Sequence, residues 1–299
     1  MMKEPLVSVV IPTYNHAQFI GNAIQSVLDQ KYQNFEVIVV DNHSTDQTNE
    51  VLQAFGNAVR MIKVHNNGVI AVSRNAGIRA AQGSVVAFLD SDDCWTADKL
   101  HRCIEKIDVG ADIVFHDMAI EGERSFYHQR RLKGRKMLSP VLTDLLVNGN
   151  AIINSTVVVK KDLLEQIGYI SEDAEMVAAE DFNTWIRIAA VTESFVYLPV
   201  ILGSYRIHSS GMSRKDMSQP MKKATAAFMD RLSGKQRNKA EARIGYAHVR
   251  SLFVNGKAAR VSMTELMFIV RHGPWAMKIK SLYMMLNRLR HKEAVKKGK

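Results

Sequence analysis

The sequence has few cysteines and no long apolar run, and each absence narrows the class of protein. Its 299 residues include two cysteines, Cys94 and Cys103, too few for a disulfide framework or a metal cluster. We therefore expect two reduced thiols in a cytosolic protein. No apolar stretch approaches the ~20 residues that a bilayer-spanning helix requires. The first apolar run, residues 6–12, ends at a proline and is too short to indicate a signal peptide.

Two glycine-rich signatures of nucleotide binding are also missing. No G-x-G-x-x-G sequence is present, which argues against a dehydrogenase. No glycine-rich phosphate loop with a lysine follows the first predicted strand, so a nucleotidyltransferase has little support.

The charge is divided unevenly along the chain. Residues 1–210 carry 19 Lys/Arg and 25 Asp/Glu, net −6, whereas residues 211–299 carry 21 and 5, net +16. A tail this basic favours an anionic partner, either membrane lipid or nucleic acid. We expect no nucleic acid, because no recognised binding motif accompanies the charge.

Apolar, β-branched runs alternate with helical patterns through the first 118 residues, which indicates βαβ units and a mostly parallel sheet. Ligands of such sheets bind at the carboxyl ends of the strands. The strands are predicted at 6–12, 35–41, 61–65, 84–90 and 111–115, and the helices at 16–30, 44–55, 69–83 and 96–108.

After residue 118 the pattern changes. Residues 121–136 are polar and basic, and we expect a loop or an irregular hairpin there. A strand and a helix are predicted within 154–168, a helix at 179–191 and a strand at 194–200. From about residue 212 the pattern is helical and increasingly basic.

Three carboxylates, Asp90, Asp92 and Asp93, follow the predicted strand 84–90. Acids this close repel one another unless a cation or several hydrogen-bond donors lie among them. A hard divalent ion is a suitable occupant, because Mg²⁺ commonly takes one or two carboxylates together with substrate phosphates. The alternative is a solvated turn whose acids cap the following helix.

Residues 7–100 resemble the start of a family 2 glycosyltransferase with the GT-A fold. The resemblance rests on motifs in order from VSVVIPTYN to FLDSDD, and it continues more loosely to about residue 213 through EDFNTWIRIA and YRIHSSGMSR. It implies a GT-A type, Rossmann-like sheet flanked by helices over 1–211. Residues 1–118 would form the nucleotide-binding half and 119–211 the acceptor-binding half. Residues 212–299 would form a basic helical C-terminal extension.

The resemblance implies a nucleotide-diphosphate sugar as donor, with a UDP-sugar as the first candidate. The donor-binding residues that it implies are Pro12, Thr13, Tyr14, Asn15, Asp41, Arg74, Asn75, Asp90 and Ser91. Three roles stay open at this point. Asp46 can contact the donor or cap a helix, Arg74 can donate to phosphate or hold the aspartate loop, and Gly77 can admit the donor or a closely packed sheet.

Asp90 and Asp92 form the D-x-D motif of the family, which implies that Asp92 binds a divalent metal, Mn²⁺ or Mg²⁺. The resemblance assigns His208 to the same metal or to the diphosphate. Asp93 would hold the loop or support the metal ligands from outside. Further candidates are Glu180, Arg206 and Arg214, the last together with Ser209 and Ser210 in a loop that closes over the diphosphate.

Asp181 aligns with the catalytic base of the family. The sequence departs from the family where a glycine-rich stretch is usual, because IGYISEDAEMVAAED stands there instead. This departure makes Asp173 a competing candidate for the base.

The implied function is inverting transfer of a hexosyl or N-acetylhexosaminyl group to a hydroxyl of a glycan or lipid-linked acceptor, in cell-surface polysaccharide synthesis. The alternatives are a catalytically inactive scaffold that binds a nucleotide sugar, or a nucleotidyltransferase.

The C-terminal segment 271–299 carries nine Lys/Arg and one Glu. Trp275, Ile279, Leu282, Leu286 and Leu289 recur at helical spacing and would form a narrow apolar stripe. We expect a cytoplasmic protein that contacts the inner face of an anionic membrane through this segment. The alternatives are a helix packed on the catalytic body or paired in a homodimer.

Overall fold

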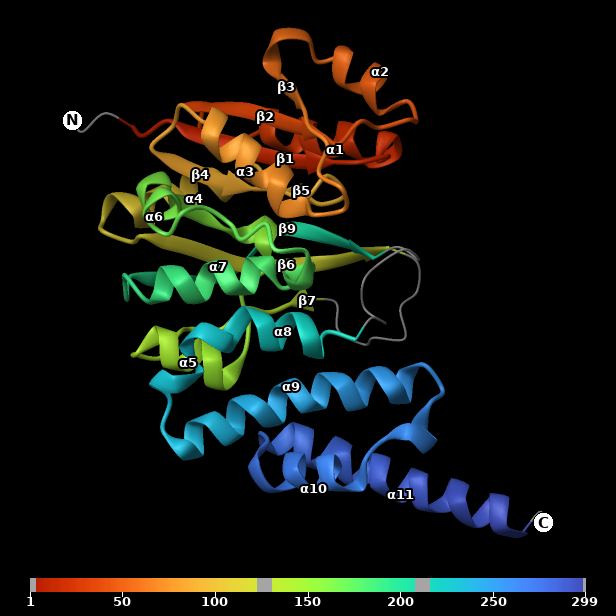
Figure 1. Cartoon of the computed structure of the whole chain (residues 1–299). Helices are drawn as coiled ribbons and strands as arrows, with labels where there is room; N and C mark the ends of the chain where they lie inside the picture. The colour runs from red at the N-terminus through yellow and green to blue at the C-terminus, as the bar shows by residue number, and fades with distance from the viewer. Residues whose placement is uncertain (1–3, 123–130, 208–215, 298–299) are drawn as a thin grey trace.

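The structure, a computed structural model, describes residues 4–122, 131–207 and 216–297, without the side chains of 289–297 (Figure 1). It has one nine-stranded sheet in the order β3-β2-β1-β4-β8-β6-β9-β5, with β7 beside β6. The strands are β1 Val7–Thr13, β2 Phe35–Asp41, β3 Arg60–Lys63, β4 Val85–Phe88, β5 Cys94–Trp95, β6 Ile113–Gly122, β7 Arg131–Leu132, β8 Val158–Lys160 and β9 Phe195–Ile207.

Strands β1 to β4 pair in parallel, as do β6 and β9, whereas β8 runs antiparallel between β4 and β6. The predicted α/β fold with a mostly parallel sheet is therefore confirmed. Every residue of β1 is buried. A strand covered on both faces is apolar in a continuous run, which is why 6–12 was recognisable from the sequence.

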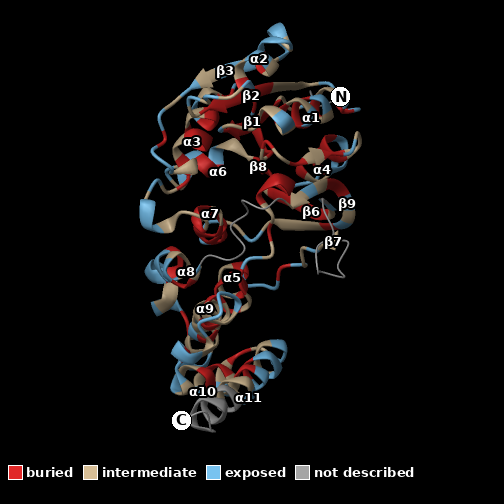
Figure 2. Ribbon diagram, turned by 90° about the vertical axis from the view of Figure 1, so that its right-hand side faces the viewer, coloured by how far each residue is buried: buried red, intermediate tan, exposed pale blue. Residues whose placement is uncertain are grey.

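Helices cover both faces of the sheet, and the buried residues concentrate between them and the strands (Figure 2). One core lies under α3, α5, α6 and α7, and includes Ile78, Leu145 and Trp185. The other lies under α1, α2 and α4, and includes Ile24 and Leu100. These helices are α1 Ala17–Leu28, α2 Thr48–Gln53, α3 Ile70–Ala80, α4 Lys99–Asp108, α5 Val141–Asn148, α6 Lys161–Gln166 and α7 Glu180–Ala189.

Gly77 is required by the packing of α3 on the sheet. A Cβ added at this position would lie 2.4 Å from the Cγ1 atom of Val10 on β1. Of the two roles left open by the sequence, the tightly packed helix is therefore the one observed. This close approach brings α3 down onto the carboxyl halves of the strands.

Strand β9 is longer than the predicted strand 194–200, because it continues past a proline. The register of β6 and β9 shifts from His116 opposite Leu198 to Asp117 opposite Ile201. Pro199 lies inside this irregularity, where a residue without an N–H group costs no ladder hydrogen bond. The extension carries Tyr205 to the carboxyl edge of the sheet. Of the segment predicted as a loop or irregular hairpin, residues 131–132 form β7, which pairs with β6, and residues 123–130 lie outside the described residues.

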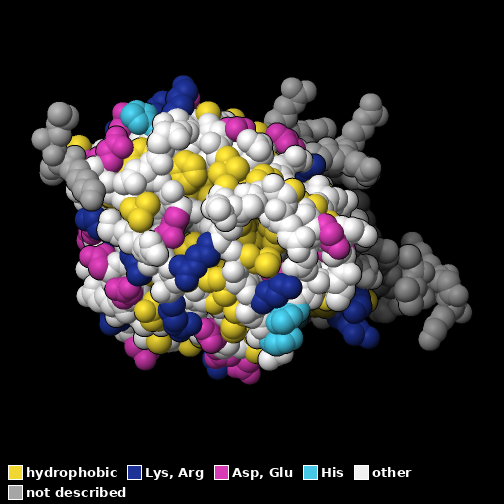
Figure 3. All heavy atoms as spheres, turned by 90° about the horizontal axis from the view of Figure 1, so that it is seen from above, with side chains coloured by type: hydrophobic (Ala, Val, Ile, Leu, Met, Phe, Trp, Pro, Cys, Tyr) yellow, Lys and Arg dark blue, Asp and Glu magenta, His cyan; other side chains and the backbone are white. Residues whose placement is uncertain are grey.

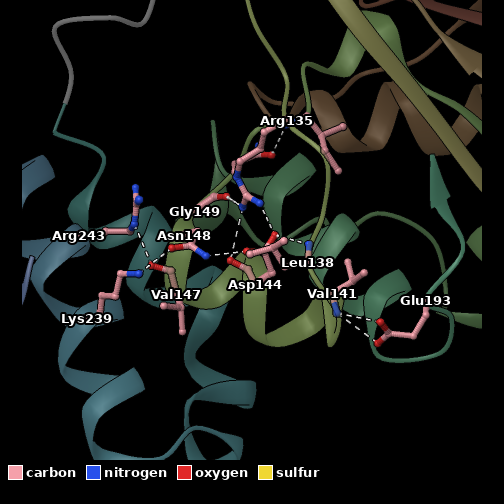
Figure 4. Close-up of polar contacts among 12 residues, drawn as sticks. Arg135, Leu138, Val141, Asp144, Val147, Asn148, Gly149, Glu193, Lys239 and Arg243 are labelled. Atoms are coloured by element: carbon pink, nitrogen blue, oxygen red, sulfur yellow. Dashed lines mark hydrogen bonds and ion pairs between the residues drawn. The ribbon is translucent and has the colours of Figure 1, made fainter. Parts of the chain in front are cut away.

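Four further helices, α8 Ser218–Thr225, α9 Gly234–Val254, α10 Met263–His272 and α11 Trp275–Lys297, confirm the predicted helical C-terminal region. Helix α9 is tied to α5: the Lys239 Nζ atom donates to Asn148 Oδ1 over 2.9 Å, and Arg243 Nε donates to the Val147 carbonyl over 2.9 Å (Figure 4). On α5, Asp144 is buried and pairs with Arg135. The C-terminal helices are thus attached through α9 to α5, which packs on the sheet.

Among the described helices, none combines the length and apolar character of a bilayer-spanning segment. Cys94 and Cys103 are both free thiols, as the sequence predicted.

Candidate active site

A pocket of about 420 Å³ lies at the carboxyl edge of the parallel strands. Its volume is in the range of small-molecule sites. The residues of its lining that the sequence predicted are Pro12, Thr13, Tyr14, Asp90, Ser91 and Asp92. The structure therefore brings together the end of β1 and the acidic loop after β4, as the edge rule for parallel sheets requires.

The lining also contains residues outside the predicted set of donor-binding and metal-binding residues. They are His16, Asn42, Asn66, Gly68, Ile70, Ser73 and Tyr205. Asn42 directly follows β2, and its Oδ1 atom accepts a hydrogen bond from the Asn66 backbone N–H over 2.8 Å. The rule that ligands bind at the carboxyl ends of parallel strands points to both asparagines, since they follow β2 and β3.

Asn15 and Asp41 are not among the lining residues, because their side chains hold the neighbouring loops together. Asp41 is fully buried and accepts from the Ser44 hydroxyl over 2.5 Å. Asn15 Oδ1 accepts from the Thr45 backbone N–H over 2.8 Å. These bonds fix the two loops that carry Tyr14 and Asn42. Contact of Asn15 or Asp41 with a donor stays a prediction.

Asp46 acts at the starts of two helices. Its carboxylate accepts from the Ala17 N–H over 3.1 Å and from the Thr48 N–H over 3.0 Å, at the first residues of α1 and α2. Although burial opposes the change, a hydrogen bond from the Thr48 hydroxyl, together with those from the two backbone N–H groups, lowers the pKa of Asp46. The helix-capping role is therefore the one that the structure shows.

Two adjacent residues at the end of β1 offer different contacts to a ligand. The Thr13 hydroxyl is buried, lines the pocket and has no hydrogen-bond partner in the described part of the chain. An unsatisfied buried hydroxyl is costly, so a ligand that bonds it would gain affinity. Tyr14 is exposed and presents an aromatic ring at the rim.

The acidic loop after β4 is a tight turn. The Asp93 backbone N–H donates to the Asp90 carbonyl over 3.0 Å. Ser91 is buried and its hydroxyl lies 2.7 Å from His16 Nδ1. Asp92 lies beside Asp90 in the lining of the pocket. The turn therefore directs two carboxylates toward the same cavity.

Arg74 holds this loop. Its guanidinium is buried and lies 2.8 Å from Asp90 Oδ1 and 2.8 Å from Glu180 Oε1. Burial opposes the charge, but the two carboxylates outweigh burial and raise the pKa of Arg74. The neighbouring Asn75 points elsewhere: its amide pairs with the Ile170 backbone in both directions, over 2.8 and 3.0 Å. Direct contact of Arg74 or Asn75 with a donor stays a prediction.

Asp93 is buried behind the loop. Burial, and then the charge of Asp90, raise the pKa of Asp93 to about 8. Its Oδ1 atom accepts from the Arg206 backbone N–H over 3.2 Å, while the Arg206 guanidinium lies 5.2 Å from the centre of the Phe19 ring. A proton on Asp93 at neutral pH would relieve part of the repulsion among the three acids.

The residues of this loop fit a divalent metal. Asp90 and Asp92 bring two carboxylates, which are hard oxygen ligands, to the pocket. Mg²⁺ commonly binds one or two protein carboxylates when substrate phosphates and water supply its other ligands. The described residues hold no group of three or more His, Cys, Asp or Glu side chains with metal-binding geometry. His208, Ser209, Ser210 and Arg214 lie outside the described residues.

Asp181 begins α7 beside Glu180. Its Oδ1 atom accepts from the Phe182 N–H over 2.5 Å, and its Oδ2 atom lies 3.3 Å from Asn150 Nδ2. Burial, and then the charge of Glu180, raise the pKa of Asp181, with Arg74 acting in the opposite direction. A carboxylate whose pKa approaches neutrality is suited to take a proton.

Asp173 has a different environment. It caps the short 3₁₀ helix η3, Ala174–Met176, by accepting from the Glu175 N–H over 2.9 Å, and it lies 3.4 Å from Lys223 Nζ. The hydrogen bond to Glu175 and the contact with Lys223 lower the pKa of Asp173. These contacts account for Asp173 as a helix cap and favour Asp181 as the candidate base.

Comparisons with known proteins show the family and the fold of this chain. Residues 8–167 match the family model described as Glycosyl transferase family 2. Over 105 residues the chain is 43% identical to TuaG of Bacillus subtilis, which is named as a putative teichuronic acid biosynthesis glycosyltransferase. This match covers 34% of this chain and 42% of TuaG. The chain spans 42% and 65% of the lengths of two curated relatives that it matches.

One relative is matched over most of its length. Over 215 residues the chain is 29% identical to WfgD of Escherichia coli, named as a UDP-Glc:α-D-GlcNAc-diphosphoundecaprenol β-1,3-glucosyltransferase; the match covers 71% of this chain and 81% of WfgD. Among solved structures, S. aureus TarS in complex with UDP-GlcNAc aligns with a TM-score of 0.66 at 21% identity, over 89% of this chain and 79% of that one. The likeness to TarS shows the fold, a GT-A type sheet flanked by helices.

Proposed function

Because the chain belongs to glycosyltransferase family 2, we propose that it is an inverting enzyme that transfers a sugar from a nucleotide-diphosphate sugar to an acceptor hydroxyl. One observation carries the proposal. A strand-end pocket lined by the D-x-D carboxylates is linked through Arg74 to the helix that begins with Glu180 and Asp181.

The proposed donor is a UDP-sugar carrying a hexosyl or N-acetylhexosaminyl group. The names of WfgD, with UDP-Glc, and of the TarS complex, with UDP-GlcNAc, support this choice. The Tyr14 ring would stack on the base, and the unpartnered Thr13 hydroxyl would bond the nucleoside. Asp90 would meet the ribose.

Asp92 would hold the divalent metal, Mn²⁺ or Mg²⁺. When bound, such an ion would neutralise charge on the departing diphosphate. Arg74 keeps the loop that carries Asp92 in place, because its guanidinium fixes one carboxylate oxygen of Asp90 at 2.8 Å. Asp93, behind the loop, would support the turn rather than contact the donor.

Asp181 would act as the base that takes the proton of the acceptor hydroxyl as its oxygen attacks the anomeric carbon. A single base and direct displacement give inversion, so no nucleophilic side chain is required. The amide of Asn150, 3.3 Å from Asp181 Oδ2, would orient the carboxylate.

The proposed acceptor is a glycan or lipid-linked sugar in cell-surface polysaccharide synthesis. The name of WfgD, which acts on a diphosphoundecaprenol-linked sugar, and that of TuaG support it. A lipid-linked acceptor would require this enzyme to work in the cytoplasm beside the inner face of a membrane.

The test is incubation of the full chain with UDP-Glc or UDP-GlcNAc and Mn²⁺, with thermal shift and UDP release as readouts. We expect a bound donor to raise the melting temperature by mass action, and slow UDP release by hydrolysis. Stabilisation without UDP formation, with or without acceptor, would instead indicate an inactive scaffold. Release of pyrophosphate from UTP and a sugar 1-phosphate would indicate a nucleotidyltransferase.

A further inference from the structure

Helix α11 presents an apolar stripe to solvent. Trp275, Ile279, Leu282 and Leu286 are between 48 and 76% exposed. Their spacing of four, three and four residues puts them on one side of the helix. Neighbouring exposed side chains of this size on one face mark an interaction surface more often than scattered ones do.

The opposite side of α11 is already occupied. Ser281 and Met284 are buried, and Met284 belongs to a core with Val249 of α9 and Ile269 of α10. The exposed stripe is therefore not the face that packs on the protein. Helix α11 therefore packs on α9 and α10 through one side, and it leaves the stripe on its other side exposed.

A basic side chain lies beside the stripe. At about 100° per residue, Lys278 falls about 60° around the helix axis from Trp275, whereas Lys280 falls about 140° away in the other direction, nearer to the buried Met284. Residues 271–299 contain nine Lys/Arg and one Glu. At the far end of the molecule, around β3 and α2, acidic and basic side chains are interspersed instead (Figure 3).

We propose that the α11 stripe, Trp275 to Leu286, is the surface with which the enzyme lies on an anionic lipid bilayer. The apolar side chains would enter the interfacial region, and Lys278 at the edge of the stripe would meet the anionic headgroups. The proposal rests on the proposed function, which requires access to a lipid-linked acceptor, and it adds the surface that gives this access.

The attachment of α11 to the rest of the chain lets this contact orient the catalytic domain. Helix α11 packs on α10 and α9, and α9 is bonded to α5 through Lys239 and Arg243 (Figure 4). Gly149 and Asn150 follow α5 directly, and Asn150 reaches Asp181. A chain of packed elements therefore joins the stripe to the candidate base.

The test uses the full chain with vesicles of phosphatidylcholine and phosphatidylglycerol at a 7:3 ratio. Of the three tryptophans, Trp95 and Trp185 are buried, so a change in emission reports Trp275. We expect co-sedimentation and a blue shift at low salt. Both should weaken at 1 M salt, where the Debye length is ~3 Å, and neither should occur with phosphatidylcholine alone.

Paired variants separate the apolar and the charged contributions. We expect Ile279→Ser with Leu286→Ser to weaken vesicle binding at least tenfold, whereas Val109→Ser, at an exposed apolar position of the catalytic domain, leaves it unchanged. Lys278→Glu should weaken binding by about tenfold, because each basic residue near an anionic surface contributes on that scale, and Arg102→Glu should not.

Vesicle binding that the stripe variants leave intact would overturn the proposal, and so would equal binding to neutral vesicles. A third contrary result is a protein that does not bind vesicles but forms a concentration-dependent dimer, measured by sedimentation velocity, that Ile279→Ser with Leu286→Ser disrupts. Vesicle binding requires neither donor nor turnover. An active enzyme that does not bind vesicles would therefore contradict only the proposed membrane surface. A protein that binds vesicles but transfers no sugar would contradict only the proposed function.

Discussion

Arg74 and Glu180 form an ion pair in the protein interior, with 2.8 Å between guanidinium nitrogen and carboxylate oxygen and side chains that are 5% and 8% exposed. The second guanidinium nitrogen holds Asp90 at the same distance. One arginine on α3 thus connects the acidic loop with the start of α7. Arg74 therefore links the loop that carries Asp92 to the first turn of the helix that carries Asp181.

The first prediction concerns the charge of Glu180. The charge of Glu180 raises the pKa of Asp181, whereas the charge of Arg74, which pairs with Glu180, lowers the pKa of Asp181. In Glu180→Gln the first effect disappears and the second persists, so the pKa of Asp181 should fall. A base must be deprotonated, so the acid limb of the kcat/KM profile should move to lower pH. Glu175→Gln, at an exposed acid of η3, should leave the limb in place. An unmoved limb in Glu180→Gln would assign the limb to a group other than Asp181.

The second prediction separates the two candidate bases. Asp181→Asn should reduce kcat by at least ~10²-fold, the usual scale for loss of a general base. Donor affinity, measured by isothermal titration with UDP, should stay within about twofold. Asp173→Asn should cost little turnover, because its carboxylate caps η3 and pairs with Lys223. If the two variants exchange these phenotypes, the base is Asp173.

The third prediction concerns the metal. Asp92→Ala should abolish transfer and remove the part of the UDP-induced thermal shift that depends on Mn²⁺. The fold should survive, because Asp90 keeps its bonds to Arg74 and Asn154. Full activity of Asp92→Ala at limiting Mn²⁺ would refute the assignment.

The strand ends were predictable because parallel strands deliver their carboxyl ends to one edge. Thr13, Ser91 and Asp92 could be placed there from local apolar runs alone, and the structure puts them in one pocket. The partner of Arg74 could not be placed in this way, because Glu180 lies 106 residues along the chain. That pair depends on how α7 packs beside α3, which no local pattern encodes.

The family pattern predicted more of the site residues than hydrophobic periodicity did, but it did not predict what each side chain contacts. It pointed to Asn75, whose amide is bonded to Ile170, and to Asp41, which is bonded to Ser44. It could not indicate that β9 continues past Pro199, because a proline inside a strand normally argues against the strand.

A buried lysine was also invisible to the sequence pattern, since Lys99 lies in a polar stretch near the start of α4. It is fully buried, and its Nζ atom lies 3.5 Å from the centre of the Trp95 ring. Within the described part of the chain Nζ has no hydrogen-bond partner. Cys103 and His116 are the titratable groups that interact with it. Burial lowers the pKa of Lys99 to about 7.

The fourth prediction follows from this lowered pKa. The unfolded chain binds the Lys99 proton up to about pH 10.5, whereas the folded chain releases it near pH 7. Between these pH values the unfolded state binds more protons than the folded state. Lys99 therefore makes the free energy of unfolding rise as the pH rises and fall as the pH falls. Lys99→Met keeps an unbranched chain and removes the charge, so it should stabilise the protein by about 1 kcal/mol or more at pH 6.

The gain from Lys99→Met should shrink at pH 9, where the folded parent no longer carries this buried charge. Urea titrations at pH 6 and pH 9 measure both values. Lys106→Met, at a partly exposed position of the same helix, is the matched control and should show no such pH dependence. A Lys99→Met protein less stable than its parent at pH 6 would mean that the ammonium group is stabilised in the fold, contrary to its burial against Trp95.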